Sequence, residues 1–126
     1  MNLVDSSGWM EYFNNGPNAS FFAHAIEDTA HLIVPTVCLF EIFKKFIQKS
    51  EENAGLKAVA FMRQGRVILL DSSLAVLSAK YSHNFKLPLA DSIIYATAQF
   101  YNTLLWTQDS DFKDLPGVKY CVRKNG

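Results

Sequence analysis

The sequence predicts an α/β fold, a three-layer α/β/α sandwich around a mostly parallel sheet of four to five strands. Two observations support this prediction. First, short runs that are almost entirely apolar alternate with longer stretches in which apolar residues recur at helical spacing. Second, strands with so few polar residues are typical of a parallel sheet that helices cover on both faces. Right-handed crossover connections then distribute the helices over two layers.

The size and the charge of the chain limit its function. The 126 residues fit one domain, residues 1–126, and 49% of them are hydrophobic, which is enough for one core. Twelve basic and twelve acidic residues give a net charge of zero, whereas a simple electrostatic nucleic-acid binder is usually more basic. If four of the acids bound a metal ion, however, the remaining eight acidic residues would be outnumbered by the twelve basic residues. The net charge therefore does not exclude a metal-dependent protein that acts on nucleic acid.

Several classes of protein are disfavoured by what the sequence lacks. The two cysteines, Cys38 and Cys121, form no metal-binding pattern with histidine, so we expect two buried reduced thiols and no zinc. Residues 1–9 lack the basic region of a signal peptide, and the uncharged stretch 92–108 is too short and polar to span a membrane. Glycine-rich phosphate loops are absent. We therefore expect a cytoplasmic protein with no membrane segment and no nucleotide cofactor.

The first half of the chain predicts two strands and four helices. In chain order these are a strand at 2–4, a helix from Ser6 or Ser7 to about Asn15, a helix from Asn18 to about Asp28, a strand at 31–35, a helix from Thr36 to Lys49 and a helix at 52–64. Ser6 or Ser7 caps the first of these helices, and Gly16 and Pro17 end it.

The second half of the chain predicts three strands and two helices. In chain order these are a strand at 66–70, a helix at 72–84, a helix that follows Pro88 and contains Asp91, and strands at 103–107 and 118–122. Asp71, Ser72 and Ser73 offer caps for the first of these helices.

Three acids, Asp5, Asp71 and Asp109, follow predicted strands. In open parallel sheets, ligands bind beyond the carboxyl ends of the strands, so these acids are candidates for a functional site. A helix cap explains Asp71, because serines and a helix follow it. An ordinary turn explains Asp5 or Asp109 taken alone. A parallel sheet nevertheless brings Asp5 and Asp109 to the same edge.

Two further acids lie on helices that begin at this edge. Glu41 shares the polar face of its helix with Lys45, and a solvent-exposed pair at i,i+4 is a simple explanation for it. An N-cap or a first-turn acid favoured by the helix dipole explains Asp91. The small residues Ala96 and Ala98 that follow Asp91 let its helix pack closely on the sheet.

Together, these acids predict a metal site. Four ionised carboxylates at one edge would repel one another and raise one another's pKa. A divalent cation removes this conflict, and a set of oxygen ligands selects Mg²⁺ or Mn²⁺. Such an ion lowers the pKa of bound water and neutralises charge on a phosphoryl group. The cluster is therefore suited to the hydrolysis of phosphodiester bonds.

Four segments carry a resemblance to a known family: LVDSSGWMEYF (3–13), IVPTVCLFEIFKK (33–45), LADSIIYATA (89–98) and LLWTQDSDFKDLPGV (104–118). In this order they resemble the PIN-domain nucleases, most closely the VapC-type toxins of toxin–antitoxin pairs. The resemblance implies a Mg²⁺- or Mn²⁺-dependent endoribonuclease that cleaves RNA. It also implies a homodimer and inhibition by a small antitoxin whose tail occupies the active-site groove.

The resemblance assigns roles to single residues. Asp5, Glu41 and Asp91 match the first three acids of the family, and the fourth lies in the T-x-D segment. We assign Asp109 as this fourth acid, with Asp111 as its competitor. Asp5, Asp91 and Asp109 would then hold the metal, while Glu41 positions or deprotonates the attacking water or completes the metal shell.

Neighbouring polar residues complete this assignment. Thr107 matches a hydroxyl that holds the metal or its water, and Ser6 matches a second supporting hydroxyl. Lys44 and Lys45 share the face of Glu41 and are candidates for contacts with RNA phosphates. Ordinary surface lysines are the alternative explanation for both.

Other functions stay open at this stage. A PIN-type nuclease of RNA processing or turnover would use the same residues without a toxin role. A phospho-acceptor of the same α/β class would need an aspartate at a central strand end, for which Asp71 is the only candidate, and an acidic pair after the first strand, where Asp5 has no acidic neighbour. A non-catalytic binding module of this class is a further alternative. A phosphatase of the haloacid-dehalogenase type is disfavoured, because Ser7 occupies the position of the second aspartate that such enzymes need.

Overall fold

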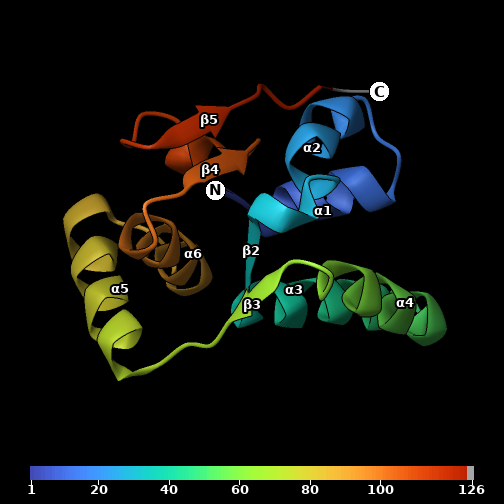
Figure 1. Cartoon of the computed structure of the whole chain (residues 1–126), viewed down its shortest axis with the longest axis horizontal. Coiled ribbons are helices and arrows are strands. Elements are labelled where there is room, and N and C mark those ends of the chain that lie inside the picture. Colours follow the sequence, from blue (N-terminus) through green and yellow to red (C-terminus); the bar gives the residue numbers. More distant parts are fainter. Residues whose placement is uncertain (125–126) are drawn as a thin grey trace.

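A five-stranded parallel sheet forms the centre of the molecule (Figure 1). The computed structural model describes residues 1–124. In sheet order the strands are β3 (Arg66–Ile68), β2 (Leu32–Pro35), β1 (Asn2–Val4), β4 (Leu104–Thr107) and β5 (Val118–Tyr120). Leu3 on the central strand lies opposite Ile33 on one side and Leu105 on the other. The prediction of a mostly parallel sheet is therefore confirmed, with five strands.

Six α-helices within the described residues cover the two faces of the sheet. They are α1 (Ser6–Phe13), α2 (Ala19–Ile26), α3 (Thr36–Gln48), α4 (Glu52–Met62), α5 (Ser72–Phe85) and α6 (Leu89–Phe100). The first four connect β1, β2 and β3, whereas α5 and α6 return the chain across the sheet to β4, so right-handed crossovers place the two sets on opposite faces. Figure 1 shows α5 and α6 below β4 and β5 and to the left of β2 and β3, with α1, α2 and α4 on the right side of the view. The three-layer sandwich is confirmed.

The core lies on both faces of the short central strands. Adjacent residues of a strand point to opposite faces, and both Leu3 and Val4 are fully buried. Helix α6 is buried along 92–98, where Ala96 and Ala98 allow it to lie close to the sheet. The uncharged residues 92–108 therefore form most of helix α6 and the whole of strand β4.

The ends of several elements differ from the sequence prediction. The predicted strand 66–70 ends at Ile68, and the exposed residues Leu69 and Leu70 follow it. His31 belongs to a short 3-10 helix, η1 (Thr29–His31), and not to β2. The last strand ends at Tyr120 and not at Val122. For β3 and β5 the reason is that edge strands have one free side, so their hydrophobic residues do not fix where pairing stops.

Helix caps also differ from the prediction at two places. The cap of α1 is Asp5 and not Ser6 or Ser7, because the Gly8 backbone N–H donates to Asp5 Oδ1 at 3.0 Å. Asn18 occupies the N-cap position of α2, but its side chain makes no capping hydrogen bond. The predicted cap at Asp71 is confirmed by a 2.9 Å bond from the Leu74 N–H.

The two cysteines are free thiols. Cys38 is fully buried, and burial raises the pKa of its thiol, so that it stays protonated. Cys121 is only half-buried, contrary to the expectation of two buried thiols. Within residues 1–124, no helix combines the length and the apolar character that crossing a membrane requires.

Candidate active site

The four predicted acids meet in one pocket at the carboxyl edge of the sheet. The cavity has a volume of about 460 Å³, and its walls include Asp5, Glu41, Asp91 and Asp109. Asp5 follows β1, Asp109 follows β4, Glu41 lies on α3 and Asp91 lies on α6. Parallel strands bring the first two acids together, and helices that begin at the same edge deliver the other two. The pocket therefore assembles four acids that are up to 104 positions apart in the sequence.

Asp5 is the most buried of these acids, with 2% of its surface exposed. Its carboxylate accepts hydrogen bonds from Thr107 Oγ1 at 2.6 Å, Ser7 Oγ at 2.8 Å and the Gly8 N–H at 3.0 Å. Burial raises its pKa to about 6, because the loss of hydration outweighs these three hydrogen bonds. The nearby charge of Asp109 acts in the same direction as burial.

Glu41 is held by Ser6 and not by Lys45. The Ser6 hydroxyl donates to Glu41 Oε1 at 2.6 Å. Within residues 1–124 the one ion pair joins His31 and Asp28, so the surface pair of Glu41 with Lys45 does not form. Ser6 therefore orients Glu41 toward the other acids, as a supporting hydroxyl would.

Asp91 lies in the first turn of α6, where Pro88 and not Asp91 occupies the N-cap position. The first-turn explanation of this acid is therefore correct, and the N-cap explanation is wrong. Burial raises the pKa of Asp91 to about 7, and the charges of Asp109, Asp5, Glu41 and Asp111 add to the effect. A carboxylate surrounded in this way gains from a bound cation more than from any helix dipole.

Asp109 and Asp111 both lie close to Asp91. One carboxylate oxygen from each of the three residues falls within 4.8 Å of the others. Asp109 is half-buried and lines the pocket, whereas Asp111 is exposed and lies outside the residues that line it. The Asp109 N–H donates to Thr107 Oγ1 at 2.9 Å, so the same hydroxyl contacts both Asp5 and Asp109.

The donors in this pocket fit a hard divalent cation. They are carboxylate and hydroxyl oxygens, and within the described residues the clustered groups include no histidine or cysteine. Oxygen ligands of this kind select Mg²⁺ or Mn²⁺ over zinc. Burial, with the neighbouring acids adding to it, raises the pKa values of Asp5 and Asp91, and a bound cation would favour their ionised forms.

Basic residues surround the pocket, and the two predicted lysines differ in their position. Lys45 lines the pocket. The Lys44 ammonium lies 5.7 Å from the centre of the Phe40 ring, outside the residues that line the pocket. Lys49 and Arg123 also line it, although the sequence prediction did not include them. Helical spacing could have identified Lys49, which lies eight residues after Glu41, whereas no sequence pattern indicates Arg123.

Comparisons with known proteins agree with this architecture. A family model described as "PIN domain" matches residues 3–118. A toxin–antitoxin complex from Klebsiella pneumoniae is similar in fold, with a TM-score of 0.76 and 23% identity over 94% of this chain and 96% of that chain. No curated protein matches the chain significantly.

Two further solved structures show the same fold at lower identity. VapC20 from Mycobacterium tuberculosis, described as a sarcin–ricin loop cleaving toxin, has a TM-score of 0.78 and 16% identity over 94% of this chain and 97% of that chain. VapBC2 from Rickettsia felis, bound to promoter DNA, has a TM-score of 0.75 and 12% identity over 94% and 97%.

Proposed function

Because this chain belongs to the PIN domain family, we propose that it is a Mg²⁺- or Mn²⁺-dependent ribonuclease and the toxin of a toxin–antitoxin pair. The observation that carries the proposal is the pocket in which Asp5, Glu41, Asp91 and Asp109 meet. In this proposal the chain forms a single PIN domain. It acts in the cytoplasm, which suits its two free thiols. It acts as a homodimer. The described toxin–antitoxin structures of the same fold support the assignment to a toxin.

The residues of the pocket have distinct roles in this proposal. Asp5, Asp91 and Asp109 hold the metal, with Asp111 as the competitor of Asp109. The bound ion supplies a lowered pKa for water and neutralises charge on the phosphoryl group. Glu41 accepts the proton of the attacking water, and the 2.6 Å bond from Ser6 keeps its second oxygen directed at the pocket.

Thr107 and Ser7 position the buried carboxylate of Asp5. Their hydroxyls donate to it at 2.6 and 2.8 Å, so the carboxylate keeps its orientation whether or not a cation is bound. Outer hydrogen bonds of this kind tune the affinity of a metal site. Lys45, at the wall of the pocket, is suited to contact an RNA phosphate.

The substitution Asp91→Asn tests the nuclease. Asparagine keeps the size of the side chain but removes the charge that a metal needs, so we expect Mg²⁺-dependent cleavage of single-stranded RNA to fall below detection. The melting temperature should not fall, because the substitution relieves repulsion among the acids. Cleavage is measured on a labelled RNA and on the DNA of the same sequence, with and without EDTA.

Asp71→Asn provides the matched control. Asp71 also follows a strand and caps a helix, but it does not line the pocket. Asparagine is an equally good N-cap, so both stability and cleavage should stay at the wild-type level. Wild-type cleavage by Asp91→Asn would refute the assignment.

Growth of the producing cells tests the toxin role separately. Induced expression of the wild type should stop growth, whereas expression of Asp91→Asn should not. Equal growth of the two cultures would favour a nuclease of RNA turnover over a toxin.

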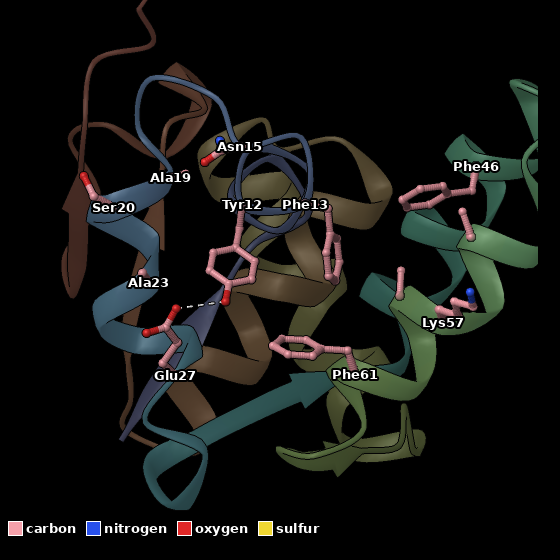
Figure 2. Close-up of a pocket in the computed structure, with 12 residues that line it drawn as sticks. Tyr12, Phe13, Asn15, Ala19, Ser20, Ala23, Glu27, Phe46, Lys57 and Phe61 are labelled. Atoms are coloured by element: carbon pink, nitrogen blue, oxygen red, sulfur yellow. Dashed lines mark hydrogen bonds between the residues drawn. The ribbon is translucent and has the colours of Figure 1, made fainter.

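An apolar groove next to the acidic pocket suits the antitoxin. Figure 2 shows Tyr12 and Phe13 of α1 next to Phe61 of α4, and both rings pack against the Phe61 ring at centroid distances of 5.9 Å. Helix α2 also lines the groove. Its volume is about 780 Å³, and Glu27 and Lys57 place opposite charges on its two rims. Such a groove fits the apolar face of an amphipathic helix.

The groove and the acidic pocket are adjacent. Asn14 lines the pocket, and its neighbour Asn15 lines the groove. Likewise, Lys45 of α3 lines the pocket, and its neighbour Phe46 lines the groove. We therefore propose that an antitoxin helix lies in the groove and that its tail reaches the acids.

The substitution Ala23→Glu tests the groove as the docking surface. A charged side chain at Ala23 would lie in the groove, so we expect it to prevent co-purification with the product of the neighbouring reading frame, while RNA cleavage persists. Ala30→Glu is the control, because Ala30 is exposed and does not line the groove. If both variants co-purified equally well with that product, the antitoxin would bind another surface and the proposed groove would be wrong.

A further inference from the structure

The segment that follows β5, residues 121–124 and called here the C-terminal arm, returns to the acidic pocket. The Cys121 N–H donates to the Thr107 carbonyl at 2.9 Å, and the Val122 carbonyl accepts from Asn18 Nδ2 at 3.0 Å. Figure 1 shows the chain beyond β5 running to α2. The next residue, Arg123, lines the pocket that contains the four acids.

Buried amides hold the arm in this position. Asn18 and Gln108 each expose only 2% of their surface. Asn18 Nδ2 donates both to Gln108 Oε1 at 2.9 Å and to the Val122 carbonyl, so both of its amide hydrogens are used. Buried amides are costly to leave unpaired, and the arm is therefore fixed relative to the end of β4.

The same network continues to the acids. The Gln108 N–H donates to Ser7 Oγ at 3.4 Å, and Ser7 Oγ donates to Asp5 Oδ1 at 2.8 Å. Asn18 occupies an N-cap position but uses its side chain for the arm and not for its own helix. A direct sequence of hydrogen bonds thus joins the most buried acid of the pocket to the segment that carries Arg123.

Three basic residues line the pocket and do not form ion pairs with its acids. They are Lys45 and Lys49 from α3 and Arg123 from the arm. Within the part of the chain that the structure describes, only His31 and Asp28 form an ion pair. Because these three basic side chains do not pair with the acids of the pocket, they are free to bind an anion of a ligand. In a nuclease this anion is the phosphate backbone, for which the guanidinium group is the best-matched side chain.

We propose that Arg123 binds a backbone phosphate of the nucleic-acid strand beside the bond to be cleaved, and that Asn18 is the positioning residue that keeps the arm in place. This inference rests on the proposed function, because it names the part of the substrate that the arm contacts. It adds a substrate contact from a part of the chain that lies outside the metal cluster.

The substitution Arg123→Gln tests the phosphate contact in an Asp91→Asn background, which prevents cleavage during the titration. Binding of a fluorescein-labelled single-stranded RNA is followed by anisotropy between about 50 and 200 mM KCl. Loss of one phosphate contact should weaken binding about fivefold and reduce the slope of log K against log salt by about 0.7. Arg123→Lys should restore most of the slope.

Lys124→Gln is the matched control. It removes the same charge from the next residue, which is exposed and does not line the pocket. Its slope should equal that of the parent. Equal slopes for Arg123→Gln and Lys124→Gln, or no RNA binding by the parent, would overturn the phosphate contact.

A double-mutant cycle tests the positioning role of Asn18. If Asn18 acts through the arm, Asn18→Ala weakens RNA binding nearly as much as Arg123→Gln, and the double variant is no weaker than either. Additive losses in the double variant would show that Asn18 does not position Arg123. A purely structural effect of Asn18→Ala would lower the melting temperature without removing the response to Arg123→Gln.

The outcomes separate this inference from the proposed nuclease. If the wild type cuts RNA and Arg123→Gln leaves the salt slope unchanged, the nuclease stands and the contact is wrong. If the wild type cuts no RNA and Arg123→Gln still reduces the slope, the arm binds phosphate and the nuclease is wrong.

Discussion

At the scale of single residues, Thr107 connects the two strands that supply acids. Its hydroxyl is fully buried, donates to Asp5 Oδ2 at 2.6 Å and accepts from the Asp109 N–H at 2.9 Å. One side chain therefore fixes the orientation of the carboxylate after β1 and of the backbone after β4. Thr107 would therefore affect the proposed metal through Asp5 and Asp109, without having to touch it.

We expect Thr107→Val to weaken Mn²⁺ binding by about 10- to 100-fold, because Asp5 loses a hydrogen bond that holds its ionised form. Isothermal titration calorimetry with Mn²⁺ measures this affinity independently of cleavage. Thr103→Val is the control: Thr103 is also buried beside β4, but its hydroxyl bonds to the Ala98 carbonyl, away from the acids. Equal Mn²⁺ affinities of the two variants would contradict the proposed role of Thr107.

Only part of the residue-level arrangement could be predicted from the sequence. The proximity of Asp5 and Asp109 could be predicted, because strand ends in a parallel sheet share an edge. Asn18, Gln108 and Arg123 were not, because their positions depend on side-chain bonds between segments about a hundred residues apart. Local patterns encode neither those bonds nor the path of the arm.

At the scale of elements, the close contact of α1 with the sheet places Asp5. Gly8 lies in the first turn of α1, and its N–H caps the helix through Asp5. A Cβ atom at Gly8 would lie 2.5 Å from Phe22 Cε1 and 2.6 Å from Val4 Cγ1. Both neighbours are fully buried, so neither has free space into which it could move.

We expect Gly8→Ala to lower the free energy of unfolding. The gain in helix propensity, about 1 kcal/mol, is smaller than the cost of overpacking a filled core, up to about 3 kcal/mol. Urea denaturation measures the difference. Gly16→Ala is the control, because the atoms nearest to a Cβ there belong to the end of the Glu11 side chain, which can move away from the buried core at the cost of one hydrogen bond from the Asn18 N–H. A Gly8→Ala variant as stable as the wild type would show that α1 can shift away from the sheet.

The elements were predicted in the correct order, but the cap of α1 was not. The sequence places Asp5, Ser6 and Ser7 side by side, and each of these residues is a good N-cap. Packing decides among them, since Asp5 is buried at the end of β1 while Ser6 turns to Glu41. Propensity alone could not distinguish three adjacent candidates.

At the scale of the whole molecule, the strand order places the acids at the centre of the sheet. The chain moves outward from β1 through β2 to β3 and then returns to β4 on the other side of β1. In sheets of this kind, ligands bind where the direction reverses, here between β1 and β4. The alternation of strands and helices made the sandwich predictable, whereas the order of its strands required the structure.

We expect the metal-free protein to lose stability as pH rises. The raised pKa values, about 6 for Asp5 and about 7 for Asp91, mean that the folded state holds protons that the unfolded state has released. The free energy of unfolding therefore falls between about pH 4 and pH 7, by about 3 kcal/mol from the fully buried Asp5 alone.

Melting temperatures in EDTA at pH 5 and pH 8 measure this dependence. Mn²⁺ should restore stability at pH 8 in the wild type but not in Asp91→Asn, because the ion replaces the lost protons and binds only the folded state. The Asp91→Asn variant should also show a weaker dependence on pH in EDTA. A wild type that is more stable at pH 8 than at pH 5 without metal would contradict the assigned pKa values.

The central position of β1 has a consequence for the order in which the protein is synthesised. Asn2–Val4 are translated about a hundred residues before one neighbour of this strand, Leu104–Thr107. Until that neighbour emerges, Asp5 lacks both Thr107 and Asp109 as partners. A nascent chain that has not yet exposed β4 therefore lacks the complete set of acids. The proposed metal site can therefore form only after β4 has joined the sheet, so a partly synthesised chain would be inactive.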